Sequence, residues 1–186
     1  MIKVILIGGG DLNSPVLECI KNESVLGIQS SKKIKAMVIP FARYEEDWEI
    51  VYNKNILKYS HPDYEYDFIC SSKNKEEFLV QLQNIELLII PGGSELDLIK
   101  NLPPLTGLNF DNKLIIATSA GVNFLSSLYY SNDRNEFTAG SGILKINTIC
   151  HFKSDSLDKI KFLTESNDRP TFALKEGEFI TLYEKA

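Results

Sequence analysis

The chain has 186 residues, of which 44% are hydrophobic and 24% charged, and its net charge at pH 7 is −5. These values are ordinary for a folded globular protein and exclude wholesale disorder. Without a stripe of Lys and Arg, neither nucleic acid nor an anionic membrane is expected as a partner. No apolar run approaches the ~20 residues that span a bilayer. A chain of 186 residues is the length of one domain, so we expect a single domain over residues 1–186.

The cysteines give no sign of a metal or of any other cofactor. Cys19, Cys70 and Cys150 are widely spaced and form neither a CxxC motif nor a metal-binding pattern. Isolated cysteines beside apolar residues are usually buried as small hydrophobes. Reduced thiols fit a cytoplasmic protein. The first apolar run stops at a triple glycine, so no signal peptide is expected.

Short apolar runs alternate with longer amphipathic stretches along the chain. Continuous apolar runs predict strands, and apolar residues at helical spacing predict helices. The alternation favours βαβ units and therefore an α/β fold with a mostly parallel sheet. In chain order the prediction is strand 4–7, helix 15–28, strand 34–39, helix 45–59, strand 68–70, helix 75–83, strand 87–90, loop 101–112, strand 114–117, a strand near 143–151, helix 155–165 and strand 179–183.

Three clusters of small residues follow predicted strands: Gly8–Gly10, Gly92–Gly93 and Ser119–Gly121. Sites in open α/β sheets form beyond the carboxyl ends of the strands, so chemistry is expected at these clusters. The triple glycine resembles a phosphate-binding loop. Asn13 stands where the dinucleotide fingerprint needs its third glycine, and no P-loop Lys-Ser/Thr follows. A tight turn between a strand and a helix is the simpler interpretation.

The segment around Ser119 has the layout of a nucleophile elbow. A predicted strand meets a helix at a serine, and Ala117, Ala120 and Gly121 leave room for close backbone approach. The positive end of the following helix would help to stabilise an oxyanion. The alternative is that Ser119 only caps the helix. The segment by itself does not decide between the two.

A serine nucleophile needs a base, and the chain has two histidines. His61 lies in a polar turn, whereas His151 ends a strand-like run and could reach the elbow. Glu176 lies where an apolar strand meets a glycine turn, so its carboxylate could orient the histidine. Taken alone, each is more often an ordinary polar or surface residue than a catalytic one. A Cys150–His151 pair is not expected, because adjacent strand residues point to opposite faces.

Together these segments resemble the serine-peptidase family of aspartyl dipeptidase (dipeptidase E), which also includes cyanophycinase. The resemblance implies a flavodoxin-like three-layer sandwich, similar to class I glutamine amidotransferases, and a cytoplasmic enzyme. The five stretches that carry it stand in the family's order over nearly the whole chain: 38–42 with Trp48 following, 88–93, 117–123, 150–152 and 174–180.

The family's residues map onto this chain one by one. Ser119 matches its nucleophile, His151 its base and Glu176 the glutamate of its E-G turn. The resemblance also implies oxyanion donors at Gly93 and Ala120. An aspartate after the nucleophile helix has been considered functional in the family, and Asp133 occupies that place. The implied activity is hydrolysis of small peptides without a cofactor or metal.

The chain departs from the family pattern at several points. Ala117 replaces the usual glycine, Ser94 replaces an asparagine, and the segment between His151 and Glu176 is short. Aspartyl dipeptidase has a longer insert there, with an arginine that recognises an acidic side chain. The three arginines of this chain that could take that role are Arg43, Arg134 and Arg169.

Two other functions stay open at this point. The same fold could serve as a non-catalytic ligand-binding or regulatory domain, since fold alone does not carry function. A nucleotide-binding flavodoxin-like protein would rest on Gly8–Gly10 alone. The oligomeric state, a homo-oligomer included, is not determined by the sequence.

Overall fold

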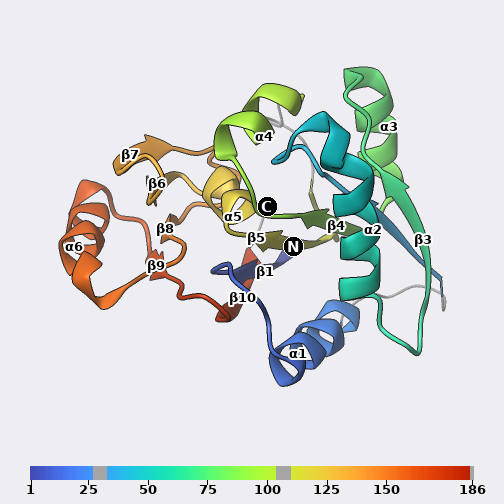
Figure 1. Cartoon of the computed structure of the whole chain (residues 1–186), viewed down its shortest axis with the longest axis horizontal. Coiled ribbons are helices and arrows are strands. Elements are labelled where there is room, and N and C mark those ends of the chain that lie inside the picture. Colours follow the sequence, from blue (N-terminus) through green and yellow to red (C-terminus); the bar gives the residue numbers. More distant parts are fainter. Residues whose placement is uncertain (27–32, 104–109, 185–186) are drawn as a thin grey trace.

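The computed structural model describes residues 1–26, 33–103 and 110–184 (Figure 1). Its larger sheet has six strands in the order β10-β1-β5-β4-β2-β3. All neighbours are parallel except β10, which runs antiparallel to β1. The strands are β1 (Ile2–Ile7), β2 (Lys33–Val38), β3 (Glu65–Cys70), β4 (Leu87–Ile90), β5 (Leu114–Thr118) and β10 (Phe179–Glu184).

Helices cover both faces of this sheet. Strands β1 and β4 are buried along their whole length, as their continuous apolar runs predict. The protein is thus a three-layer α/β sandwich with a mostly parallel sheet, which confirms the predicted fold class. The apolar core on one face includes side chains of α1 (Ser14–Val25) and α2 (Trp48–Tyr59), and that on the other includes side chains of α3 (Lys75–Asn84), α4 (Glu95–Asn101) and α5 (Ala120–Leu125).

A second sheet of four strands lies beside α5, with α6 (Leu157–Ser166) on its outer side (Figure 1). Its order is β7-β6-β8-β9, and only the β6–β7 pair is antiparallel. The larger apolar core continues toward it through Leu144, Cys150 and Leu174. The strands are β6 (Leu128–Ser131), β7 (Glu136–Ala139), β8 (Asn147–Ile149) and β9 (Thr171–Ala173).

The predicted helices at 75–83 and 155–165 correspond to α3 and α6, and that at 45–59 begins with a 3₁₀ turn, Glu45–Asp47, before α2. The strand predicted near 143–151 was too long, because regular pairing is limited to Asn147–Ile149. The β6–β7 hairpin and the seven-residue α4 were not predicted, since such short elements show little periodicity. The end of the helix predicted at 15–28 and most of the loop predicted at 101–112 lie outside the described residues.

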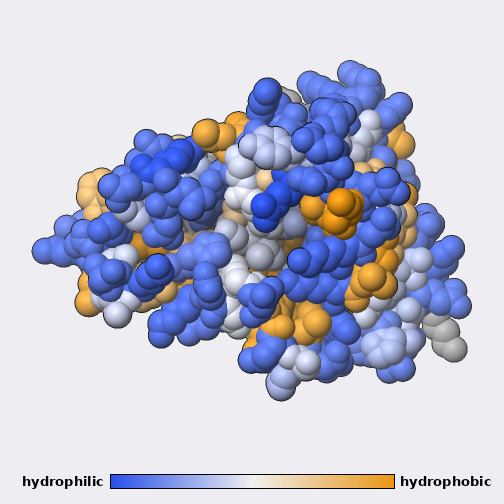
Figure 2. Space-filling view, viewed as in Figure 1, coloured by the Kyte–Doolittle hydropathy of each residue, from blue (hydrophilic) through white to orange (hydrophobic). Residues whose placement is uncertain are grey.

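The surface is largely hydrophilic on the face shown in Figure 2, with apolar side chains in small separate areas. Ile50 and Leu57 of α2 are examples of such exposed apolar residues. Scattered exposure of this kind is normal for a folded protein. Across the described ranges, no helix combines the length and the hydropathy needed to cross a membrane.

Candidate active site

Ser119 occupies a sharp turn between the end of β5 and the start of α5. Its φ of 48° and ψ of −106° are unusual for a residue with a side chain and cost about 1–3 kcal/mol. The Ser119 N–H donates to the Ile7 carbonyl oxygen at 3.0 Å, and the Ser119 carbonyl oxygen accepts from the Asn123 N–H at 3.0 Å. These bonds hold the turn from both sides. Ala117 is fully buried in β5, so its methyl group fits within the predicted elbow.

His151 follows β8 closely and also has a positive φ, 52°. Its N–H donates to the Gly8 carbonyl oxygen at 2.9 Å, and the Phe152 N–H donates to the Leu174 carbonyl oxygen at 3.0 Å. Gly8 follows β1 of the larger sheet and Leu174 follows β9 of the smaller one, so the backbone at 151–152 is hydrogen-bonded to the ends of both sheets. His151 Nε2 lies 2.8 Å from Ser119 Oγ, which confirms the expected contact between serine and histidine.

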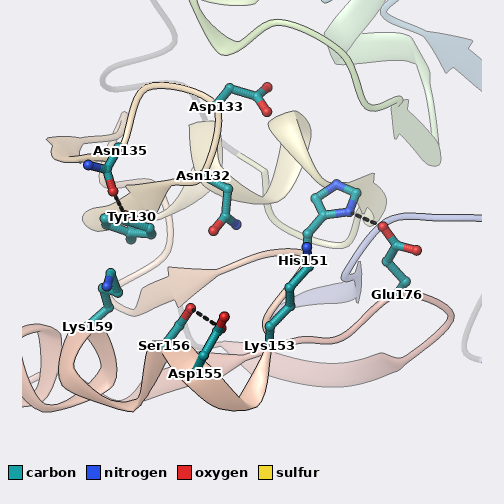
Figure 3. Close-up of a pocket in the computed structure, with 10 residues that line it drawn as sticks. All are labelled: Tyr130, Asn132, Asp133, Asn135, His151, Lys153, Asp155, Ser156, Lys159 and Glu176. Atoms are coloured by element: carbon teal, nitrogen blue, oxygen red, sulfur yellow. Dashed lines mark hydrogen bonds and ion pairs between the residues drawn. The ribbon is translucent and has the colours of Figure 1, made fainter.

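Glu176 meets the other nitrogen of the same ring. Its Oε1 lies 3.0 Å from His151 Nδ1 (Figure 3). Because an ionised carboxylate only accepts, this contact selects the tautomer with the proton on Nδ1, in which Nε2 is free to accept from the Ser119 hydroxyl. Asp133 is exposed on the turn between β6 and β7, apart from this contact. In the structure, therefore, Glu176 rather than Asp133 contacts the His151 ring.

The triple glycine after β1 makes room for this arrangement. A Cβ on Gly9 would lie 2.2 Å from His151 Cε1, and one on Gly10 would lie 2.8 Å from Glu176 Cβ. Gly8 is equally close to the main chain, 2.2 Å from the Lys175 carbonyl oxygen. The Gly177 N–H also donates to the Gly9 carbonyl oxygen at 2.9 Å. The tight-turn interpretation was therefore incomplete, since the glycines also leave room for the His151 ring and the Glu176 side chain.

The second glycine pair borders the serine from the other side. A Cβ on Gly92 would lie 3.2 Å from Ser119 Cβ. Gly93 has φ of 154°, and a Cβ there would lie 2.0 Å from the Ala42 carbonyl oxygen, so only glycine fits. Ala120 is the first residue of α5, where an N–H has no partner within the helix. Gly93 and Ala120 thus lie near the serine, while their role as oxyanion donors stays a prediction.

A polar cavity of about 520 Å³ opens beside the histidine (Figure 3). Lys159 in its lining pairs with Asp158 at 3.0 Å. Lys153 lines the cavity as an exposed cation. The cavity therefore offers charges of both signs next to the imidazole. Its lining includes Asn132, Asp133, His151, Lys153, Asp155 and Glu176.

The sulfur and phenol groups beneath the site do not take part in the contacts of Ser119 Oγ. Burial raises the pKa of the Cys150 thiol, so it stays protonated, and its Sγ lies 3.6 Å from the Ser119 carbonyl oxygen. Burial also raises the pKa of Tyr59 to about 12, and its hydroxyl lies 3.3 Å from Thr118 Oγ1. In the part of the chain that the structure describes, no cluster of His, Cys, Asp or Glu could hold a metal ion.

The three arginines lie in different surroundings. Arg43 borders the Gly93 turn, since a Cβ on Gly93 would lie 3.0 Å from Arg43 Nε. Arg134 pairs with Glu136 at 2.9 Å and donates to the Tyr129 hydroxyl at 3.0 Å. Arg169 is exposed between α6 and β9. Of the three, Arg43 is thus the one whose side chain lies beside the Gly93 turn.

Comparison with known proteins shows that the fold is similar to those of solved peptidase structures. The chain is similar to a peptidase from an acI-B1 Actinobacterium, with a TM-score of 0.64 and 21% identity over 97% of this chain and 82% of that one. It is also similar to a putative Peptidase E protein from Listeria monocytogenes EGD-e, with a TM-score of 0.55 and 12% identity over the whole of both chains. The fold is that of these peptidases. No protein-family model and no curated protein matches the sequence.

Proposed function

We propose that this protein is a serine-type peptidase that hydrolyses small peptides. The observation that carries the proposal is the chain of contacts from Glu176 through His151 to Ser119, at 3.0 and 2.8 Å, with the serine on a strained turn. A nucleophile, a base and an orienting group in this order are what covalent catalysis requires. The peptidase folds of the two similar structures support the same class of reaction. The three free cysteines fit a reducing compartment, so we place the enzyme in the cytoplasm.

The mechanism follows from the proposed roles. Ser119 Oγ attacks the scissile carbonyl carbon while His151 Nε2 takes the hydroxyl proton. Glu176 holds the imidazole in the required tautomer and stabilises its positive charge. The Gly93 and Ala120 N–H groups donate to the oxyanion, and each such donor is worth about 3–4 kcal/mol of barrier. His151 then gives the proton to the leaving amine. Water attacks the acyl-enzyme carbonyl carbon as His151 Nε2 takes its proton, and the bond to Ser119 Oγ breaks as that proton returns to Ser119.

The polar cavity supports a short substrate. Since His151 protonates the leaving amine, the cavity beside its ring lies on the leaving-group side. Lys153 can pair there with a free carboxylate, as a dipeptide would present it. Asp133 and Asp155 add negative charges to the lining. A peptide whose leaving residue carries a free carboxylate therefore fits this surface better than an apolar ester.

A fluorophosphonate probe tests the proposed nucleophile directly. We expect the purified protein to be labelled with one-to-one stoichiometry, and peptide mass spectrometry to place the adduct on Ser119. Phosphonylation needs both an activated serine and a site for the phosphoryl oxygen, so a helix-capping serine would not react. A folded protein that stays unlabelled and hydrolyses no dipeptide would instead support the non-catalytic ligand-binding domain.

Arg43 provides a test of substrate preference. A carboxylate in the substrate needs a paired cation, and the Arg43 guanidinium borders the oxyanion side of the site. For Asp-X dipeptides we expect Arg43→Ala to raise KM by about 10-fold, the loss of one exposed charged contact. Neutral dipeptides should be affected little. Arg169→Ala is the matched control, and an equal effect of both variants would contradict this assignment.

A further inference from the structure

A carboxylate and an amide are buried together behind the candidate oxyanion hole. Glu95 is 8% exposed and Asn123 is 4% exposed. Asn123 Nδ2 donates to Glu95 Oε1 at 2.8 Å. Thr148 Oγ1, from β8, donates to Asn123 Oδ1 at 3.4 Å, which sets the direction in which the amide faces.

This hydrogen bond joins the segments that carry the reacting groups. Glu95 begins α4 two residues after Gly93, and Asn123 lies one helical turn after Ser119, to whose carbonyl oxygen its N–H donates. The two segments also touch directly, since a Cβ on Gly121 would lie 2.4 Å from the Ile90 carbonyl oxygen. The Glu95–Asn123 bond therefore connects the segment that contains Gly93 to the helix that begins at Ala120, and these two residues are the proposed oxyanion donors.

Stability alone is a poor reason for this pair. Removing a carboxylate from water is costly, and the Asn123 amide together with the charge of Arg134 compensates only part of that cost. Buried ionic groups can often be exchanged for apolar residues of similar volume without loss of stability. The geometry of the hole is a better reason, because a donor shifted by about 1 Å can cost on the order of 100-fold in rate.

We propose that Glu95 and Asn123 are positioning residues that set the distance between the Gly93 and Ala120 N–H groups. The proposal rests on the peptidase function and adds a role that sequence analysis did not assign. Glu95 touches no substrate and acts through the two turns that it connects. Its loss should lower the stabilisation of the oxyanion while leaving the ground-state binding of substrate nearly intact.

The first test compares two carboxylates in the same helical turn. For Glu95→Ala we expect kcat for a hydrolysed dipeptide to fall about 10- to 100-fold, with KM changed less than about 3-fold. Fluorophosphonate labelling should slow in parallel. Asp97→Ala is the matched control, since Asp97 also lies in the first turn of α4 and its N–H, which the substitution keeps, donates to Ser94 Oγ. Glu95→Gln keeps the acceptor and should restore most of the rate.

An apolar replacement separates positioning from folding. The double variant Glu95→Met with Asn123→Leu leaves no unpaired member of the pair, and Thr148 Oγ1 keeps its contact with Ser126 Oγ at 2.7 Å. We expect its thermal midpoint to stay close to that of the wild type while kcat remains low. A wild-type kcat in this variant, or equal losses in Glu95→Ala and Asp97→Ala, would overturn the proposal. Absence of labelling in the wild type would instead refute the peptidase function itself.

Discussion

Replacing Ser119 by alanine is expected to lower kcat for dipeptide hydrolysis by about 10⁴- to 10⁶-fold, the range seen when a serine nucleophile is removed. The substitution removes only the hydroxyl group. His151, which contacts that hydroxyl in the wild type, keeps its contact with Glu176. The thermal midpoint should stay close to that of the wild type, because the hydrogen bonds that hold the turn are made by the backbone of residue 119. Steady-state kinetics with several dipeptides and a thermal melt measure both effects.

The matched control for this variant is Ser166→Ala. Ser166 lies at the end of α6, where its hydroxyl donates to the Phe162 carbonyl oxygen of its own helix. Its loss should leave kcat unchanged. If Ser119→Ala retained more than about one hundredth of the wild-type kcat, a nucleophilic role for Ser119 would be refuted.

Gly9→Ala is expected to lower kcat by about 100-fold or more without removing any catalytic group. The new Cβ would lie 2.2 Å from Cε1 and 2.5 Å from Nε2 of His151. The ring must then move, and a displacement near 1 Å is enough to break the alignment with Ser119. Hydrolysis rates and the chemical shifts of the imidazole protons report the loss of rate and the movement of the ring together.

The strain of a positive φ needs its own control in this experiment. Gly142 has φ of 68°, similar in sign to the 111° of Gly9, but a Cβ there would meet nothing nearer than 4.0 Å. Gly142→Ala should therefore destabilise the protein by about 1–3 kcal/mol and leave kcat nearly unchanged. Equal losses of kcat in both variants would mean that backbone strain, and not contact with His151, explains the result.

The main sheet could be predicted because its strands are continuous apolar runs, as in 4–7 and 87–90, with amphipathic helices between them. Ser119, His151 and Glu176 could be selected because each follows a strand in a segment that resembles the peptidase pattern. Their mutual distances depend on how the second sheet packs against the first. No local pattern contains that information, so only the structure brings the three side chains together.

Two parts of the site were missed for different physical reasons. The triple glycine was interpreted as a turn, since the sequence shows that a side chain is absent at Gly9 but not which side chain takes its place. The buried Glu95 was overlooked because glutamate is nearly always exposed, and its burial depends on Asn123, 28 residues away. Close approach and paired burial are both tertiary effects.

The pairing of β1 with β10 has a consequence for how the enzyme is made. Ile7 pairs with Phe179, and the Gly8 N–H donates to the Glu178 carbonyl oxygen at 3.0 Å. During synthesis, Ser119 leaves the ribosome long before Glu176 and β10 do. Because β1 and β10 lie at opposite ends of the sequence, their pairing also has to close a long loop, which slows its formation. If Ser119, His151 and Glu176 act as proposed, the growing chain carries an inert serine, and hydrolysis begins only after β10 has paired with β1.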